Sequence, residues 1–186
     1  MVSAAILMGG MAIWSMHYLG NRAIDIDGGD FDLQIEYSPG YTAGSFFLAV
    51  FGVMLAFYFF SVRENLTWSG TTLGGFFMGS AICGMHYMGQ GGINNYTSVY
   101  YPRFVIGSAL IAISASMVAL RIFFQSKAKW TNTAVRRGGS AVLLATAVCG
   151  MHYCASAGTR YRLKNFNAGR SLGLSREHVV TTVICL

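Results

Sequence analysis

The sequence contains three closely similar stretches: IWSMHYLG at residues 13–20, ICGMHYMG at 82–89 and VCGMHYCA at 148–155. Each stretch closes a long apolar run and contains Met-His-Tyr. The three histidines are His17, His86 and His152. Three copies of one motif at equivalent positions and nearly equal intervals indicate a chain built from a repeated unit.

Long runs without charge surround these motifs. Apolar residues make up 54% of the 186 residues and charged residues only 11%, whereas a soluble domain carries about a quarter charged residues. A membrane-spanning helix needs about 20 apolar residues. The runs that meet or nearly meet this length are 2–20, 41–61, 71–90, 104–124 and 139–158, and the start of another lies at 179. The sequence therefore predicts an all-α fold, a polytopic transmembrane helical bundle formed by one integral membrane domain over 1–186 and truncated at one or both ends.

The repeated unit is a pair of helices, one plain and one ending in the motif. The plain runs resemble each other, since SFFLA at 45–49 matches SALIA at 108–112. Glycines such as Gly75 and Gly79 lie within the runs, where small residues let membrane helices approach closely. Because alternate helices point the same way, all three motifs are expected on one membrane face. Lys and Arg are similarly numerous on both sides, so the positive-inside rule does not assign that face.

The motif residues are candidate metal ligands. Imidazole and thioether groups together suit copper better than calcium or magnesium. Neighbouring helical residues point about 100° apart, so the histidines are preferred over the methionines. Cysteines stand three residues before two of the histidines, on the same helix face. The predicted metal ligands are His17, His86, His152, Met16, Met85 and Met151, with Cys83 and Cys149 as secondary candidates.

Each motif residue also has a purely structural interpretation. A histidine at a helix C-terminus interacts favourably with the helix dipole, and a methionine is a flexible packing residue. Three copies on one membrane face favour a shared site over these alternatives. For Tyr18, Tyr87 and Tyr153 we expect the aromatic belt at the membrane interface, and for the cysteines we expect small buried residues.

The three motifs together resemble the MHYT domain family, and the likeness covers essentially the whole chain. The resemblance implies an integral membrane module of six helices, with the motifs near the extracytoplasmic face. It further implies bound copper, sensing of a diatomic gas or redox state, and fusion to cytoplasmic signalling domains. The residue after Met-His-Tyr departs from the family pattern, because it is Leu19, Met88 or Cys154 and never Thr.

The sequence thus predicts a sensory or signalling module that contacts membrane lipid, takes a diatomic gas as ligand and acts on an unidentified downstream partner. A haem-b electron carrier and a transporter or channel component remain alternatives. No enzymatic activity is predicted, since the carboxylates lie in loops and no nucleophile–base pair is evident. The basic stretch 127–137 suits anionic lipid, and nucleic-acid binding is not predicted.

Overall fold

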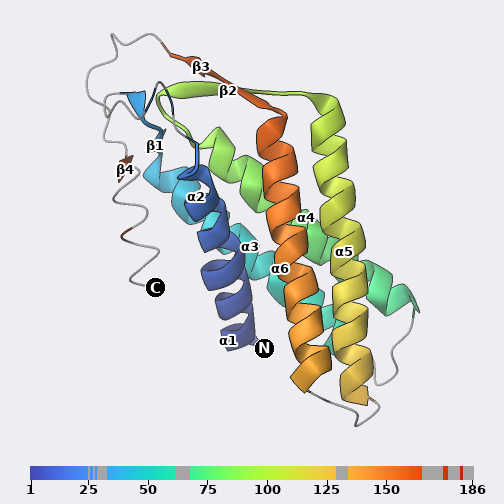
Figure 1. Ribbon diagram of the computed structural model, residues 1–186. Coiled ribbons are helices and arrows are strands. Elements are labelled where there is room, and N and C mark those ends of the chain that lie inside the picture. The colour runs from blue at the N-terminus through green and yellow to red at the C-terminus, as the bar shows by residue number, and fades with distance from the viewer. Residues whose placement is uncertain are drawn as a thin grey trace.

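Five long helical rods form the body of the protein in the part of the chain that the structure describes (Figure 1). The computed structural model describes residues 1–24, 26, 28, 33–61, 68–128, 134–164, 174–175 and 181. The first rod is continuous and consists of α1 (Val2–Ala5), the π-helix η1 (Ile6–Trp14) and α2 (Ser15–Asn21). The others are α3 (Pro39–Ser61), α4 (Trp68–Gly91), α5 (Pro102–Ala128) and α6 (Ala134–Ala157). The predicted all-α bundle is confirmed, whereas the segment predicted to start at 179 lies outside the described residues except for Thr181.

Four of the rods are long and apolar enough to cross a membrane. These four are Val2–Asn21, Pro39–Phe60, Pro102–Phe124 and Arg137–Ala157. Helix α4 has a similar length but is rich in Gly, Ser and Thr, and it packs against α3 on one side and α5 on the other. Neighbouring helices therefore cover much of this glycine-rich rod.

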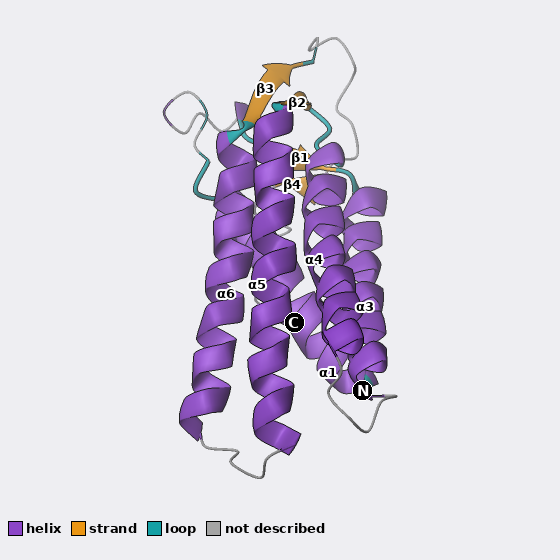
Figure 2. Ribbon diagram, turned by 90° about the vertical axis from the view of Figure 1, so that its right-hand side faces the viewer, coloured by secondary structure: helices purple, strands orange, loops and turns teal. Residues whose placement is uncertain are grey.

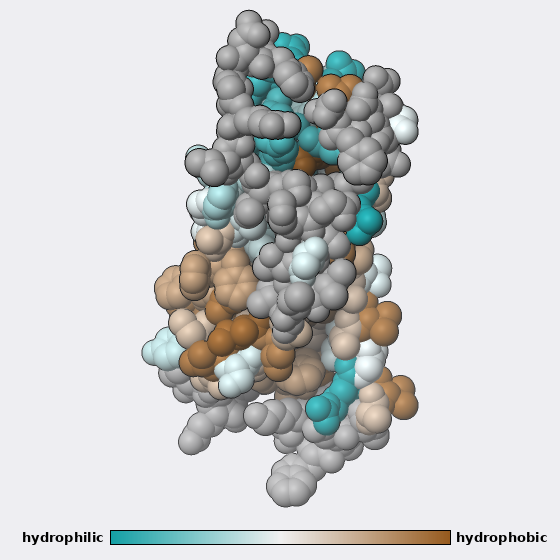
Figure 3. Space-filling model, turned by 90° about the vertical axis from the view of Figure 1, so that its left-hand side faces the viewer, coloured by the Kyte–Doolittle hydropathy of each residue, from teal (hydrophilic) through white to brown (hydrophobic). Residues whose placement is uncertain are grey.

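The surface of the bundle is apolar and its interior contains polar groups. Phe47, Leu110 and Val142 are 67%, 64% and 66% exposed, whereas Ser45 and Ser108 are fully buried. A soluble protein shows the opposite tendency. Figure 3 shows hydrophobic residues gathered over the helices in its lower half and hydrophilic residues at its upper end. This distribution fits a bundle surrounded by lipid.

Close contacts of α4 depend on glycine. A Cβ atom added to Gly79 would lie 2.5 Å from the Cα atom of Ile113 on α5, and one added to Gly75 would lie 2.7 Å from the Cα atom of Met117. The backbone of α5 occupies the space that a side chain would need. The expectation that small residues allow close helix packing is confirmed at these two positions.

Two short antiparallel strand pairs were not predicted. Strand β2 (Tyr96–Tyr100) follows α4 and pairs with β3 (Thr159–Leu163), which follows α6. Strand β1 (Glu36–Tyr37) pairs with β4 (Leu174–Ser175). Figures 1 and 2 show β2 and β3 together at one end of the bundle. This end, termed the strand end, is where the three motif helices finish.

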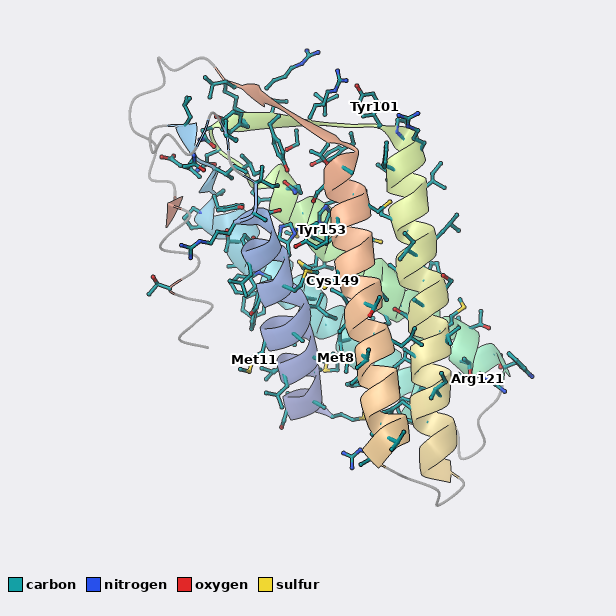
Figure 4. All side chains as sticks on the ribbon, in the orientation of Figure 1. Met8, Met11, Tyr101, Arg121, Cys149 and Tyr153 are labelled. Carbon is teal, nitrogen blue, oxygen red and sulfur yellow. The ribbon has the colours of Figure 1, made fainter. Side chains whose placement is uncertain are left out.

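The opposite end of the bundle carries a cation–aromatic contact. The Arg121 guanidinium lies 3.7 Å from the centroid of the Trp68 ring, and its Nη1 donates to Thr71 Oγ1 at 3.3 Å. Figure 4 shows Arg121 far from Tyr101, which marks the strand end. The run predicted at 104–124 includes Arg121, and an arginine near the end of a membrane helix can place its charge at the interface.

Candidate metal centre

The three motif histidines meet inside the bundle. His17 on α2, His86 on α4 and His152 on α6 are each at most 1% exposed. The ring centroids are 4.8 Å apart for His17 and His86, 5.1 Å for His86 and His152, and 5.4 Å for His17 and His152. One nitrogen from each ring lies within 4.8 Å of the others. The sequence argument that placed all motifs on one face is therefore consistent with their convergence, and we call this set the histidine triad.

Some triad nitrogens lack a side-chain partner within the described chain. Nε2 of His86 makes no hydrogen bond there, and neither ring nitrogen of His152 has a side-chain partner. Buried polar atoms normally have a partner, so this cluster is suited to a ligand. Three nitrogens that bind one ion at about 2.0–2.1 Å would lie roughly 3.5 Å apart. The distance between Nδ1 of His17 and Nδ1 of His86 is 3.1 Å, and the three candidate nitrogens lie within 4.8 Å of one another, so the rings would have to move together before all three could bind one ion.

Small residues make room for the imidazoles. The position three residues after each histidine is Gly20, Gly89 or Ala155. A Cβ atom on Gly20 would lie 2.5 Å from Nε2 of His152, and one on Gly89 would overlap Nε2 of His17. Each of these glycines therefore accommodates the histidine of a neighbouring motif helix. The small residue was visible in the aligned motifs, but its role requires knowledge of which helices are neighbours.

The predicted methionine ligands are all in or beside the core. Met85 and Met151 are fully buried, while Met16 is half-buried against the hydrophobic core. Their burial is compatible with either packing or ligation. Ligation by methionine stays a prediction.

The secondary candidates do not belong to the triad. Among the described His, Cys, Asp and Glu side chains, the metal-like cluster consists of the three histidines alone. Cys83 and Cys149 are half-buried, and Cys83 packs against the hydrophobic core. Figure 4 shows Cys149 further from the strand end than Tyr153 on the same helix. Both cysteines are thus only partly buried, where small buried residues were expected, and ligation by them stays a prediction.

Two of the three motif tyrosines differ from the expected interfacial belt. Tyr18 is only 2% exposed, and its hydroxyl lies 3.2 Å from Ser45 Oγ on α3. The hydroxyl of half-buried Tyr87 lies 3.0 Å from Ser108 Oγ on α5. These serines begin the two similar segments of the plain helices. Two motif tyrosines therefore join a motif helix to the following plain helix, whereas Tyr153 is 55% exposed.

A second polar layer, missed in the sequence, lies one helical turn beyond the triad. The residue four positions after each histidine is Asn21, Gln90 or Ser156. Residues at this spacing share one face of a helix. Asn21 and Gln90 are each 1% exposed and hydrogen-bond to each other at 3.3 Å. The signal that could have revealed this layer was the recurrence of a polar residue at one motif position.

The comparison with protein families agrees with this architecture. The sequence model of MHYT, described as "Bacterial signalling protein N terminal repeat", matches residues 10–74 and 79–136. The chain belongs to the MHYT family. The two matched segments contain the first two motifs, and the third motif at 148–155 follows them. As an MHYT protein with four potential membrane-spanning helices, the chain is a membrane signalling module.

Two characterised bacterial proteins are similar over most of this chain. "Bifunctional diguanylate cyclase/cyclic di-GMP phosphodiesterase MucR" from Pseudomonas aeruginosa is 30% identical over 100% of this chain and 26% of its own length. "Signaling protein YkoW" from Bacillus subtilis is 31% identical over 82% of this chain and 18% of its own length. The chain thus spans about a quarter or less of these relatives. No solved structure matches the chain significantly.

Proposed function

We propose that this membrane module senses a diatomic gas or a redox state through copper bound by His17, His86 and His152. The observation that carries the proposal is the contact of three buried imidazoles from three separate helices. Leaving a polar group buried and unpaired costs about 1–3 kcal/mol. A ligand shared by the three rings would offset that cost.

The charge of the donor set favours a monovalent ion. The described metal-like cluster contains no carboxylate or cysteine, so its ligands are neutral. The cost of burying an ion without a counter-charge rises steeply with its charge. Imidazole nitrogen, supplemented by a soft thioether, suits copper. When bound, copper would supply a redox-active centre with a free coordination position for a small molecule.

The chain's own residues would transmit a change at this site. The imidazoles project from α2, α4 and α6, so a change in the spacing of their nitrogens would alter the packing of those helices. The strand end would face the extracytoplasmic side, and membrane lipid would cover the apolar surface. A downstream signalling partner would then respond, a role consistent with the names of the two relatives.

The alternative functions gain no comparable support. The three histidine rings contact one another directly, which leaves no space for a haem macrocycle between any two of them. Absorption spectra of oxidised and reduced protein would test this point, because a haem band would contradict the copper proposal and support the haem-b alternative. No specific observation favours transport.

The copper content of the protein tests the proposal. Protein purified in detergent is exposed to copper under reducing and under oxidising conditions, washed, and analysed by mass spectrometry. We expect about one copper per chain, lost when His17→Ala, His86→Ala and His152→Ala are combined. His178→Ala is the matched control, because it removes the one histidine outside the motifs. Retention of copper by the triple variant, or no copper in the wild type under either condition, would overturn the proposal.

Gas binding requires a separate measurement. Carbon monoxide added to the copper(I)-loaded protein should give a new infrared stretching band. We expect that band to disappear in the triple histidine variant and to persist in His178→Ala. Copper binding without this band would leave redox sensing as the function of the site.

A further inference from the structure

A chain of hydrogen bonds connects the triad with the strands outside the membrane. Asn21 Nδ2 lies 3.4 Å from Nε2 of His17. Gln90 Nε2 donates to Asn21 Oδ1 at 3.3 Å, and the Tyr161 hydroxyl donates to Gln90 Oε1 at 3.2 Å. The residues belong to α2, α4 and β3, so the chain crosses three elements that are distant in sequence.

The two amides in this chain can each take two orientations. A carboxamide has a donor end and an acceptor end, and a neutral imidazole has one nitrogen of each kind. Oxygen and nitrogen of an amide occupy nearly the same space. Turning both amides together would therefore preserve all three contacts and reverse the direction of each hydrogen bond.

The two directions of the hydrogen-bond chain leave different ring nitrogens of His17 without a hydrogen. When the Asn21 amide nitrogen donates to Nε2 of His17, the ring hydrogen is on Nδ1, which lies 3.1 Å from Nδ1 of His86. The His17 nitrogen that faces His86 then has no free lone pair. When Asn21 instead presents its oxygen, Nε2 carries the hydrogen and Nδ1 is free to bind a cation. Histidines that bind metals usually donate their other N–H to such an acceptor.

The reversal would continue to the strand end. With its oxygen directed at His17, Asn21 presents its NH2 group to Gln90, which must turn its oxygen toward Asn21. Gln90 then offers its NH2 group to Tyr161, and the tyrosine hydroxyl changes from donor to acceptor. The contact between Asn21 Nδ2 and the Tyr37 hydroxyl, at 3.1 Å, can reverse in the same way.

We propose that Asn21 and Gln90 are positioning residues that select the ligand nitrogen of His17 and link the state of the triad to Tyr161 in β3. The step in which a bound cation selects one direction of the hydrogen bonds rests on the proposed function. The step in which Asn21 sets the tautomer of His17 does not rest on it, because the contact between these two residues is present without a metal. Burial raises the pKa of Tyr161 to about 12, so its hydroxyl keeps its hydrogen near neutral pH.

The metal-free protein provides the first test. Side-chain nitrogen signals of ¹⁵N-histidine are recorded in detergent micelles, and His17 is identified by the signals lost in His17→Ala. We expect one dominant tautomer of His17 in the wild type and a mixture in Asn21→Leu. Asn21→Asp offers only acceptor oxygens and should fix the form with hydrogen on Nε2. Identical His17 signals in the wild type and both variants would overturn the proposal.

Ser156→Ala is the matched control for this test. Ser156 occupies the equivalent position of the third motif, and its buried hydroxyl makes no hydrogen bond in the described part of the chain. Its removal should leave the His17 signals unchanged. Equal disturbance by Ser156→Ala and Asn21→Leu would show a general packing effect and would also overturn the proposal.

Addition of copper(I) provides the second test. Loss of a group that orients a metal ligand typically lowers affinity about 10–100-fold, and we expect a decrease in this range for Asn21→Leu. In the wild type, copper(I) should change amide hydrogen exchange in residues 159–163, and Tyr161→Phe should bind copper while losing that change. The same change in Tyr161→Phe would contradict the link to β3. Absence of copper in the wild type would refute the proposed function and the link together, while the metal-free test would still decide the role of Asn21.

Discussion

Nδ1 of His17 lies 3.1 Å from Nδ1 of His86, although 69 positions separate the two residues in the chain. They occupy equivalent positions in two repeats, and His152 from the third repeat completes the triangle. Repetition of a helix pair has thus placed three copies of one side chain in contact. A single copy of the motif would have no such partners.

The glycines beside the triad are expected to control the position of the histidines. In Gly89→Ala the added methyl group would overlap Nε2 of His17, so the imidazole must move. Inserting a methyl group into a packed interior typically costs about 1–3 kcal/mol. We expect a lower thermal unfolding midpoint and a weaker copper(I) affinity, measured by competition with a chromophoric chelator.

Gly91→Ala is the control for this substitution. It lies at the end of the same helix, and a Cβ atom there would meet no atom within 4 Å. Equal copper affinity in Gly89→Ala and Gly91→Ala would contradict the role assigned to Gly89.

The tyrosine–serine contacts are expected to stabilise adjacent helices. Tyr87→Phe removes the hydrogen bond to Ser108, and loss of such a bond typically costs about 0.5–1.5 kcal/mol. The free energy of unfolding in mixed micelles should fall by this amount. Tyr153→Phe, which changes a tyrosine that is 55% exposed, should have a smaller effect. A double-mutant cycle with Ser108→Ala that shows no coupling energy would rule out the contact.

Packing between α4 and α5 should be sensitive to one methyl group. A Cβ atom on Gly79 would lie 2.5 Å from the Cα atom of Ile113, and backbone cannot move aside as a side chain can. We expect Gly79→Ala to lower the free energy of unfolding by about 1–3 kcal/mol. In Gly150→Ala the added atom would lie 3.8 Å from the Cγ2 atom of Ile111, which is an ordinary contact. Both changes favour helix to the same extent, so equal stability of the two variants would refute close packing at Gly79.

Tyr161 is expected to make stability depend on pH in alkaline solution. Burial raises its pKa to about 12, nearby Tyr100 acts in the same direction, and the hydrogen bond to Gln90 opposes the shift. The unfolded chain releases this proton near pH 10, so the folded state binds more protons between about pH 10 and 12. Stability from this group is complete below pH 10 and declines through that interval. Between these pH values the thermal unfolding midpoint should fall less steeply with pH in Tyr161→Phe than in the wild type. An equal slope in the two proteins would contradict the raised pKa of Tyr161.

Much of the helical framework could be predicted because the membrane imposes strong local rules. Runs of about 20 apolar residues must become helices when lipid offers no hydrogen bonds to the backbone. The direction of alternate helices follows from their number, so the histidines could be assigned to one face. The three same-face copies also favoured a shared site, but the separations of the three rings could not be predicted, because they depend on which helices are neighbours.

Features that depend on such long-range contacts escaped prediction. Strands β2 and β3 are five residues each, and their paired residues lie 59 to 67 positions apart in the chain. Gly20 and Gly89 have a clear purpose only beside a histidine from another helix. Tyr18 was expected at the interface because tyrosine is common there, yet Ser45 provides a buried partner for it. In each case the deciding group lies outside the local sequence.

X-ray absorption at the copper edge would test the central claim most directly. The account predicts that copper(I)-loaded wild-type protein has two or three nitrogen neighbours at about 2.0 Å, with the multiple-scattering pattern of imidazole, and that the pattern disappears when His17, His86 and His152 are replaced. A metal environment made only of sulfur or water oxygen, or one unchanged by the three replacements, would contradict it.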